Sequence, residues 1–114
     1  MDGQHLFEGV QTPPHALTVF VPLGDVPEEM GVPEFFPHSQ QIPVLQQMGQ
    51  GQFEYAPVSF SPLHRGAAII FDYRCVHRGT ANRSTEPRPM LYMVYTKSWF
   101  ADRANFGEAS LFEQ

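Results

Sequence analysis

The chain has 114 residues, enough for one domain and hardly for two. Its 7 Lys and Arg against 12 Asp and Glu leave a net charge of −5, which argues against the basic face of a nucleic-acid binder. Its apolar runs are far shorter than the roughly 20 residues of a membrane-spanning helix, and its first residues lack the pattern of a signal peptide. The single cysteine excludes an internal disulfide and favours a reducing cytoplasm. We therefore expect a cytoplasmic protein without nucleic-acid or membrane partners.

The first expected strand covers residues 16–23, which are apolar, partly β-branched and bounded by proline and glycine. The glutamine-rich residues 37–52 contain two glycines and are expected to form a long exposed loop. Residues 52–60 have the pattern of a weaker strand. Pro57 suits the edge of a sheet better than its centre, because proline lacks the N–H that a central strand donates.

Two further strands are expected at residues 67–71 and 90–95, and a short helix at residues 101–105. Short strands separated by long irregular loops predict a mainly β fold with two antiparallel sheets, which is a double-stranded β-helix or cupin-like jelly roll. About five strands are fewer than the eight of a complete jelly roll. We therefore expect residues 1–114 to form a single partial domain that is incomplete at its N-terminus.

One histidine and one arginine stand where two consecutive strands would meet. His77 follows an apolar strand and precedes a Gly/Asn turn, and Arg88 stands directly before the strand at residues 90–95. In a jelly roll both side chains could face one cavity, where an imidazole can bind a metal and a guanidinium can bind a carboxylate. On spacing alone, however, a purely structural histidine is the commoner interpretation.

Several blocks occur in an order and spacing that one enzyme family shares. They are Asp2-Gly3, residues 17–25, Glu28-Glu29-Met30-Gly31, Phe36-Pro37-His38-Ser39, residues 66–72, and residues 77–84 with Arg88. Over most of its length the chain thereby resembles the C-terminal half of the phytanoyl-CoA dioxygenase domain. Members of this family are oxygenases that use Fe(II) as cofactor and 2-oxoglutarate as cosubstrate, and the resemblance implies oxidation of a small organic molecule.

The resemblance also implies roles for individual residues. Asp2 corresponds to the carboxylate ligand of iron and His77 to the distal histidine ligand. Arg88 corresponds to the arginine that binds the distal carboxylate of 2-oxoglutarate. Thr18 and Gly79 correspond to positions that line the cosubstrate pocket. No separate catalytic residue is expected, since the oxidation is the chemistry of the cofactor.

The first histidine ligand of the family would precede Asp2 by two residues, where this chain has none. His5 follows Asp2 by three residues, and the shift of five positions would turn its side chain to the opposite face of a strand. His5 is thus a poor substitute. We expect a truncated oxygenase domain that binds iron weakly and has little or no activity. The alternative is a non-catalytic jelly-roll module that binds a small molecule or a partner chain.

Absent strands would leave apolar faces and sheet edges uncovered, so we expect a homodimer or a higher oligomer, with a two-fold dimer as the favoured closed form. Two smaller expectations concern single residues. His15 lies between a proline and the first strand and is expected to be exposed, and Cys75 is expected to be a small buried apolar residue.

Overall fold

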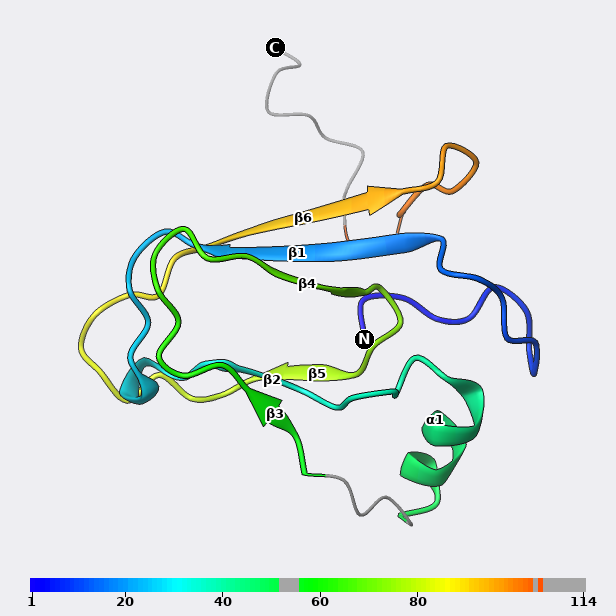
Figure 1. Cartoon of the computed structure of the whole chain (residues 1–114), viewed down its shortest axis with the longest axis horizontal. Helices are drawn as coiled ribbons and strands as arrows, with labels where there is room; N and C mark the ends of the chain where they lie inside the picture. The colour runs from blue at the N-terminus through cyan, green and yellow to red at the C-terminus, as the bar shows by residue number, and fades with distance from the viewer. Residues whose placement is uncertain (52–55, 104, 106–114) are drawn as a thin grey trace.

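Figure 1 shows the computed structural model, which describes residues 1–51, 56–103 and 105. Two antiparallel three-stranded sheets face each other, with the N-terminus between them. The first sheet has the order β4-β1-β6, with β1 at Ala16–Pro22, β4 at Ile69–Asp72 and β6 at Met90–Thr96. The second has the order β3-β2-β5, with β2 at Pro33–Phe35, β3 at Val58–Ser59 and β5 at His77–Gly79. The mainly β, jelly-roll fold expected from the sequence is confirmed.

The strands expected at residues 16–23, 67–71 and 90–95 correspond to β1, β4 and β6. Two expectations are wrong. The expected loop at residues 37–52 contains the helix α1 (Ile42–Gly49), which begins with a proline in its first turn, where the missing N–H breaks no helical bond. The described residues of the expected helix at 101–105 are not helical. A 3-10 turn, η1 (Glu28–Met30), precedes β2.

The weaker strand expected at residues 52–60 is shorter than predicted, because only β3 is extended and residues 52–55 lie outside the described residues. The strands β2 and β5 were not expected. Each has three residues, too few for a pattern of alternating polarity to appear in the sequence. Among the described residues, no helix is long and apolar enough to cross a membrane.

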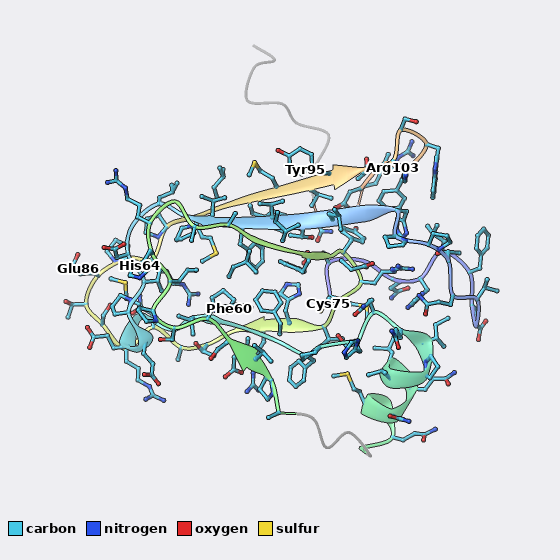
Figure 2. The ribbon with its side chains drawn as sticks, in the orientation of Figure 1. Phe60, His64, Cys75, Glu86, Tyr95 and Arg103 are labelled. Atoms are coloured by element: carbon cyan, nitrogen blue, oxygen red, sulfur yellow. The ribbon has the colours of Figure 1, made fainter. Side chains whose placement is uncertain are left out.

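The apolar core lies between the two sheets (Figure 2). Its buried residues come from both sheets and from the loops that join them; they are Val26, Val32, Phe35, Leu63, Ile69 and Cys75. The burial of Cys75 confirms its expected role as a small apolar residue. Thr18 of β1 is fully buried, whereas Leu17, one residue earlier, is 42% exposed. Thr18 and Leu17 point to opposite faces of the sheet. The outer face, which carries Leu17 and Ile70, is partly open to solvent, although Val19 on the same face is only 8% exposed.

A buried ion pair holds the turn between β4 and β5. Arg74 is 1% exposed, and its Nε and Nη2 donate to the two oxygens of Asp72 at 3.0 and 2.9 Å. Its Nη1 donates to the Thr12 carbonyl at 3.0 Å. Burial raises the pKa of Asp72, but the hydrogen bonds and charge of Arg74 outweigh this effect and lower the pKa below its ordinary value. The pair attaches the segment before β1 to the end of β4.

The expectation that His15 is exposed is wrong, since only 3% of its surface is exposed. Its ring packs edge-on against Phe100, with centroids 4.6 Å apart, and against Tyr73 at 6.0 Å. Neither ring nitrogen has a hydrogen-bond partner within the part of the chain that the structure describes. The residues after β6 cover this position, a long-range contact that local sequence does not reveal. Burial, assisted by the charge of Arg74, lowers the pKa of His15 below 6.5.

This buried imidazole predicts a loss of stability in mild acid. The unfolded chain takes up a proton at His15 near pH 6.5, whereas the folded protein resists protonation until a lower pH. The unfolded state therefore binds more protons, and the free energy of unfolding falls as the pH drops below about 6.5. His15→Phe keeps an aromatic ring in place and removes this titration. Urea unfolding between pH 7.5 and 5 should show a flatter pH dependence for His15→Phe than for wild type, whereas parallel curves would contradict the assignment.

Candidate functional site

His77 opens β5, and its ring packs among aromatic side chains between the two sheets. Its ring contacts Phe71, Phe20 and Phe35, with centroids 4.8, 5.7 and 5.7 Å apart. Its Nδ1 donates to the Cys75 carbonyl at 3.0 Å. This bond fixes the orientation of the imidazole and turns Nε2 toward the N-terminal segment.

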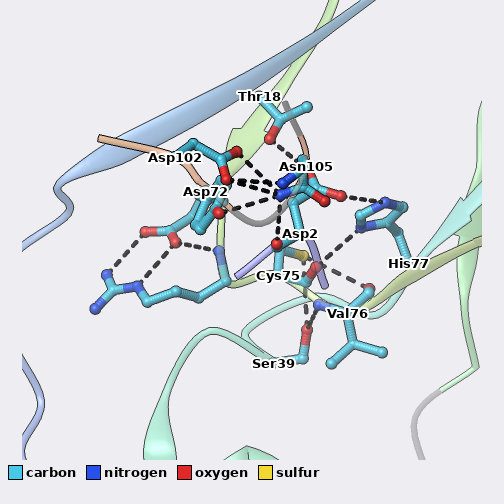
Figure 3. Close-up of polar contacts among 11 residues, drawn as sticks. Asp2, Thr18, Ser39, Asp72, Cys75, Val76, His77, Asp102 and Asn105 are labelled. Atoms are coloured by element: carbon cyan, nitrogen blue, oxygen red, sulfur yellow. Dashed lines mark hydrogen bonds and ion pairs between the residues drawn. The ribbon is translucent and has the colours of Figure 1, made fainter. Parts of the chain in front are cut away.

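The N-terminal segment, which lies between the two sheets, brings Asp2 to His77 (Figure 3). Its Oδ1 lies 3.3 Å from Nε2 of His77, and its Oδ2 accepts a hydrogen bond of 2.5 Å from the hydroxyl of Thr18. The side chains of Asp2 and His77 are only 12% and 14% exposed. Burial raises the pKa of the Asp2 carboxyl, but the hydrogen bonds from His77 and Thr18 outweigh burial and lower the pKa. The carboxylate is thus held in its charged form.

A cavity of about 260 Å³ opens beside His77 and is lined by Phe20, Pro33, His77, Arg78, Gly79, Arg88 and Met90. Ligand pockets for drug-sized molecules have about 300–1,000 Å³, so this cavity suits a smaller molecule. Nη1 of Arg88 donates to the carbonyls of Gly31, Met30 and Thr80. Gly79 faces the other guanidinium nitrogen, since a Cβ at this glycine would lie 3.6 Å from Nη2.

The residues singled out in the sequence fall into two groups that share His77. Asp2, Thr18 and His77 form one hydrogen-bonded cluster, and His77, Gly79 and Arg88 line the adjoining cavity. Thr18 is not among the residues that line this cavity, because its hydroxyl is turned to Asp2. The geometry of Thr18 therefore supports a role in orienting the Asp2 carboxylate rather than in contacting the cosubstrate.

A carboxylate and an imidazole are ligand types that non-heme Fe(II) takes, and here their donor atoms converge. The bond from Nδ1 of His77 to a backbone carbonyl is also typical of a metal-binding histidine. Asp2 and His77 therefore fit two of the three protein positions of a 2-His-1-carboxylate centre. Among the described residues, no group of three His, Cys, Asp or Glu side chains could hold a metal ion.

His5 does not join Asp2 and His77. It lines a wider cavity of about 610 Å³ between the N-terminal segment and α1, and its pKa is lowered by burial and by Arg74. The residues expected to bind metal and cosubstrate do not line this wider cavity, so the smaller cavity beside His77 is the better candidate site.

Sequence reasoning missed a tyrosine at this site. Tyr92 of β6 lies opposite Phe20 in the register, and burial, together with the charge of Asp2, raises its pKa to about 12. The phenol therefore stays protonated beside the carboxylate. The alternation along β6 could have indicated this position. Tyr92 and Val94 lie two residues apart, so their side chains share one face of the strand, and they pair with the inward residues Phe20 and Thr18 of β1.

Comparison with known proteins adds two findings. The family model described as Phytanoyl-CoA dioxygenase (PhyH) matches residues 2–90. A similar solved structure is that of the non-heme alpha ketoglutarate dependent epimerase SnoN from nogalamycin biosynthesis, with 35% sequence identity and a TM-score of 0.58. The similarity covers 70% of this chain and 30% of that chain. The matched region thus spans less than a third of that protein's length.

The hydrogen bond between Thr18 and Asp2 predicts a measurable pKa effect. Thr18→Val removes the hydroxyl that stabilises the charged carboxylate, so the pKa of Asp2 should rise while burial still acts on it. Carbon-detected NMR titration of the metal-free protein measures this directly. Thr96→Val, which removes a hydroxyl bonded to the Phe100 carbonyl, is the matched control and should leave Asp2 unchanged. An identical Asp2 titration in wild type and Thr18→Val would contradict the prediction.

Proposed function

The chain belongs to the phytanoyl-CoA dioxygenase family, and from this premise we propose that it forms part of an Fe(II)- and 2-oxoglutarate-dependent oxygenase for a small organic substrate. The observation that carries the proposal is the convergence of Asp2 and His77 beside a cavity that also holds Arg88. Asp2 and His77 supply a metal-binding pair, and the ring of His77 also lines the cavity in which Arg88 supplies an anion-binding group. The resemblance to an alpha ketoglutarate dependent enzyme supports the same class of cosubstrate.

Asp2 and His77 would hold Fe(II). When bound, this ion would supply oxidation by O2. One oxygen atom of O2 would convert 2-oxoglutarate to succinate with release of CO2, and the other would be inserted into a C–H bond of the substrate. The Cys75 carbonyl would keep the imidazole oriented, and Thr18 would keep the carboxylate charged. Both ligands are thus prepared for the metal before it binds.

Arg88 would bind the distal carboxylate of 2-oxoglutarate. Its Nη1 is already engaged by backbone carbonyls, which leaves Nη2, on the side of Gly79, for the ligand. A charge-assisted hydrogen bond of this kind contributes about 1.5–3 kcal/mol. The absence of a side chain at Gly79 leaves room beside the guanidinium. Phe20 and His77 line the same cavity and would exclude water from the bound cosubstrate.

A second candidate function is a non-catalytic jelly-roll module that binds a small molecule or a partner chain. One observation favours it: among the described residues, Asp2 and His77 have no third ligand. Two protein ligands hold a metal more weakly than three, and without a metal the cavity beside Arg88 would serve only to bind a carboxylate. The two functions predict different results when a third metal ligand is supplied: an oxygenase should then convert 2-oxoglutarate to succinate, whereas a non-catalytic module should not.

We propose that the partners are small molecules rather than nucleic acid or membrane, in keeping with the net charge of −5. We further propose a reducing cytoplasm as the compartment. Its support is Cys75, which is a free and buried thiol.

Metal binding and turnover test the proposed function. The chain itself should bind Fe(II) weakly and form little succinate from 2-oxoglutarate in the presence of ascorbate. A variant extended by a histidine directly before Met1 places an imidazole two residues before Asp2, and should bind Fe(II) at least about 10-fold more tightly and form succinate. Succinate is the appropriate product to follow because it reports use of the cosubstrate, whichever change the substrate undergoes.

The matched control carries an alanine in place of the added histidine and should behave as wild type. His77→Ala in the extended chain should abolish succinate formation and lower the affinity for Fe(II). If the added histidine changes neither affinity nor turnover, the oxygenase proposal is wrong and the non-catalytic module stands. If the unextended chain turns over 2-oxoglutarate robustly, a third ligand exists and the assignment of two ligands is wrong.

We propose in addition that the chain is a homodimer formed by the solvent-facing side of the first sheet. Leu17, Ile70, Leu91 and Tyr95 lie there and are 42 to 63% exposed, and Figure 2 shows Tyr95 pointing away from the second sheet. Exposed apolar faces of this kind mark interaction surfaces. The homodimer is the closed arrangement most often formed.

Sedimentation equilibrium at micromolar concentration should accordingly give twice the mass of one chain. The double variant Ile70→Lys and Tyr95→Lys should be monomeric, because the charges would lie in the contact. Phe7→Lys removes a similarly exposed apolar side chain from the N-terminal segment and should remain dimeric. A folded wild-type monomer would overturn the proposal.

A further inference from the structure

The backbone that carries Asp2 is held by residues far away in the sequence. The amides of Asp2 and Gly3 both donate to the Tyr73 carbonyl, at 3.1 and 3.3 Å. The ring of Tyr73 also packs directly on Gly3, since a Cβ at position 3 would lie 1.5 Å from its Cε1. Any side chain at position 3 would displace this ring. Tyr73 thereby determines where the segment lies.

Asn105 adds a second attachment from the other end of the chain. Its Nδ2 donates to the Asp2 carbonyl at 2.8 Å and lies 3.2 Å from the Tyr73 hydroxyl. Figure 3 shows this amide between Asp2 and Asp102. Asp102 fixes the amide in turn, because its two oxygens lie 3.2 and 3.0 Å from Nδ2 and its Oδ1 accepts the backbone N–H of Asn105 at 3.1 Å.

The Tyr73 phenol belongs to the same network. Burial, together with a hydrogen bond to Asp102, raises its pKa to about 12, so the hydroxyl remains protonated at neutral pH. The hydroxyl can thus donate to Asp102 while it accepts from Asn105. Asn105, Asp102 and Tyr73 are thus joined to one another and to the main chain of Asp2, which restricts the motion of this segment.

We propose that Asn105, held by Asp102 and Tyr73, is a positioning residue that fixes the main chain of Asp2 and thereby aims its carboxylate at the metal position beside His77. This inference rests on the proposed function. The inference goes beyond the proposed function, because Asn105 lies outside the residues 2–90 that the family model matches. The carboxylate is oriented by Thr18 at one end of the residue, and the carbonyl is held by Asn105 at the other.

The test uses Co²⁺ as the probe of the metal position in the chain of residues 1–114, because this ion absorbs visible light and replaces Fe(II) without being oxidised. Asn105→Leu keeps the approximate size of the side chain and removes its donors. It should weaken Co²⁺ binding about 10-fold, the usual effect of losing a residue that orients a metal ligand. Asn105→Gln retains the amide and should recover most of the affinity. Urea unfolding of the metal-free variants separates this effect from a loss of stability.

Asn82→Leu is the matched control, because among the described residues the Asn82 amide bonds only to Ser84 and Glu86 of its own turn. It should bind Co²⁺ as wild type does. If Asn105→Leu does not fold, Tyr73→Phe replaces it: the ring remains on Gly3, the hydroxyl is lost, and a smaller loss of affinity is expected. Unchanged binding in the folded variant, with binding lost in His77→Ala, would overturn the positioning role and leave the proposed function intact. Unchanged binding in His77→Ala as well would overturn both.

Discussion

The contact between the Asp2 carboxylate and the His77 imidazole joins the two sheets of the fold. Asp2 is attached to the first sheet through Thr18 and Tyr73, whereas His77 begins β5 of the second sheet. Both side chains are nearly buried, and a buried charge is costly unless it is paired and hydrogen-bonded. Every donor near the carboxylate therefore matters, because the loss of one leaves the nearly buried charge with a single partner to offset its desolvation. The same requirement makes the pair suitable for a cation, since a metal ion compensates a buried carboxylate still better than an imidazole does.

The position of His77 depends on how the chain passes from one sheet to the other. After β4 the turn is closed by Asp72, whose carboxylate accepts the Arg74 amide at 2.9 Å and whose carbonyl accepts the Cys75 amide at 2.8 Å. Ser39, which has no exposed surface, then accepts the Val76 amide at 2.7 Å and donates to the Phe36 carbonyl at 2.6 Å. The turn is thus attached to the segment that follows β2. Cys75 presents its carbonyl to His77 because the residues on both sides of it are fixed.

The residues of the site that sequence could predict are those with a local pattern or a motif. Asp2, His77 and Arg88 belong to blocks whose order resembles a family, and β1 and β6 are long enough for their apolar alternation to be visible. His15 and Asn105 have no such signal, because each acquires its role from contacts with the opposite end of the chain. The helix α1 was missed for a different reason. It has only eight residues, too few for a helical period to stand out among the flanking glutamines and glycines, and none of them is buried in the core.

The anion-binding end of the site depends on a close approach between two backbones. Gly31 has a φ of +77°, and a Cβ there would lie 2.4 Å from the Thr80 carbonyl oxygen. Only glycine combines this conformation with this proximity at low cost, and the result is that the carbonyls of Gly31 and Thr80 both reach Nη1 of Arg88. A guanidinium held on one side by carbonyls keeps its charge and its planar geometry while it loses freedom of rotation. The entropy of ordering a long side chain is then lost on folding and not on binding, so a carboxylate that enters the cavity meets a donor already in place. Gly31 and Arg88 therefore act together in binding a carboxylate, although 57 residues separate them in the chain.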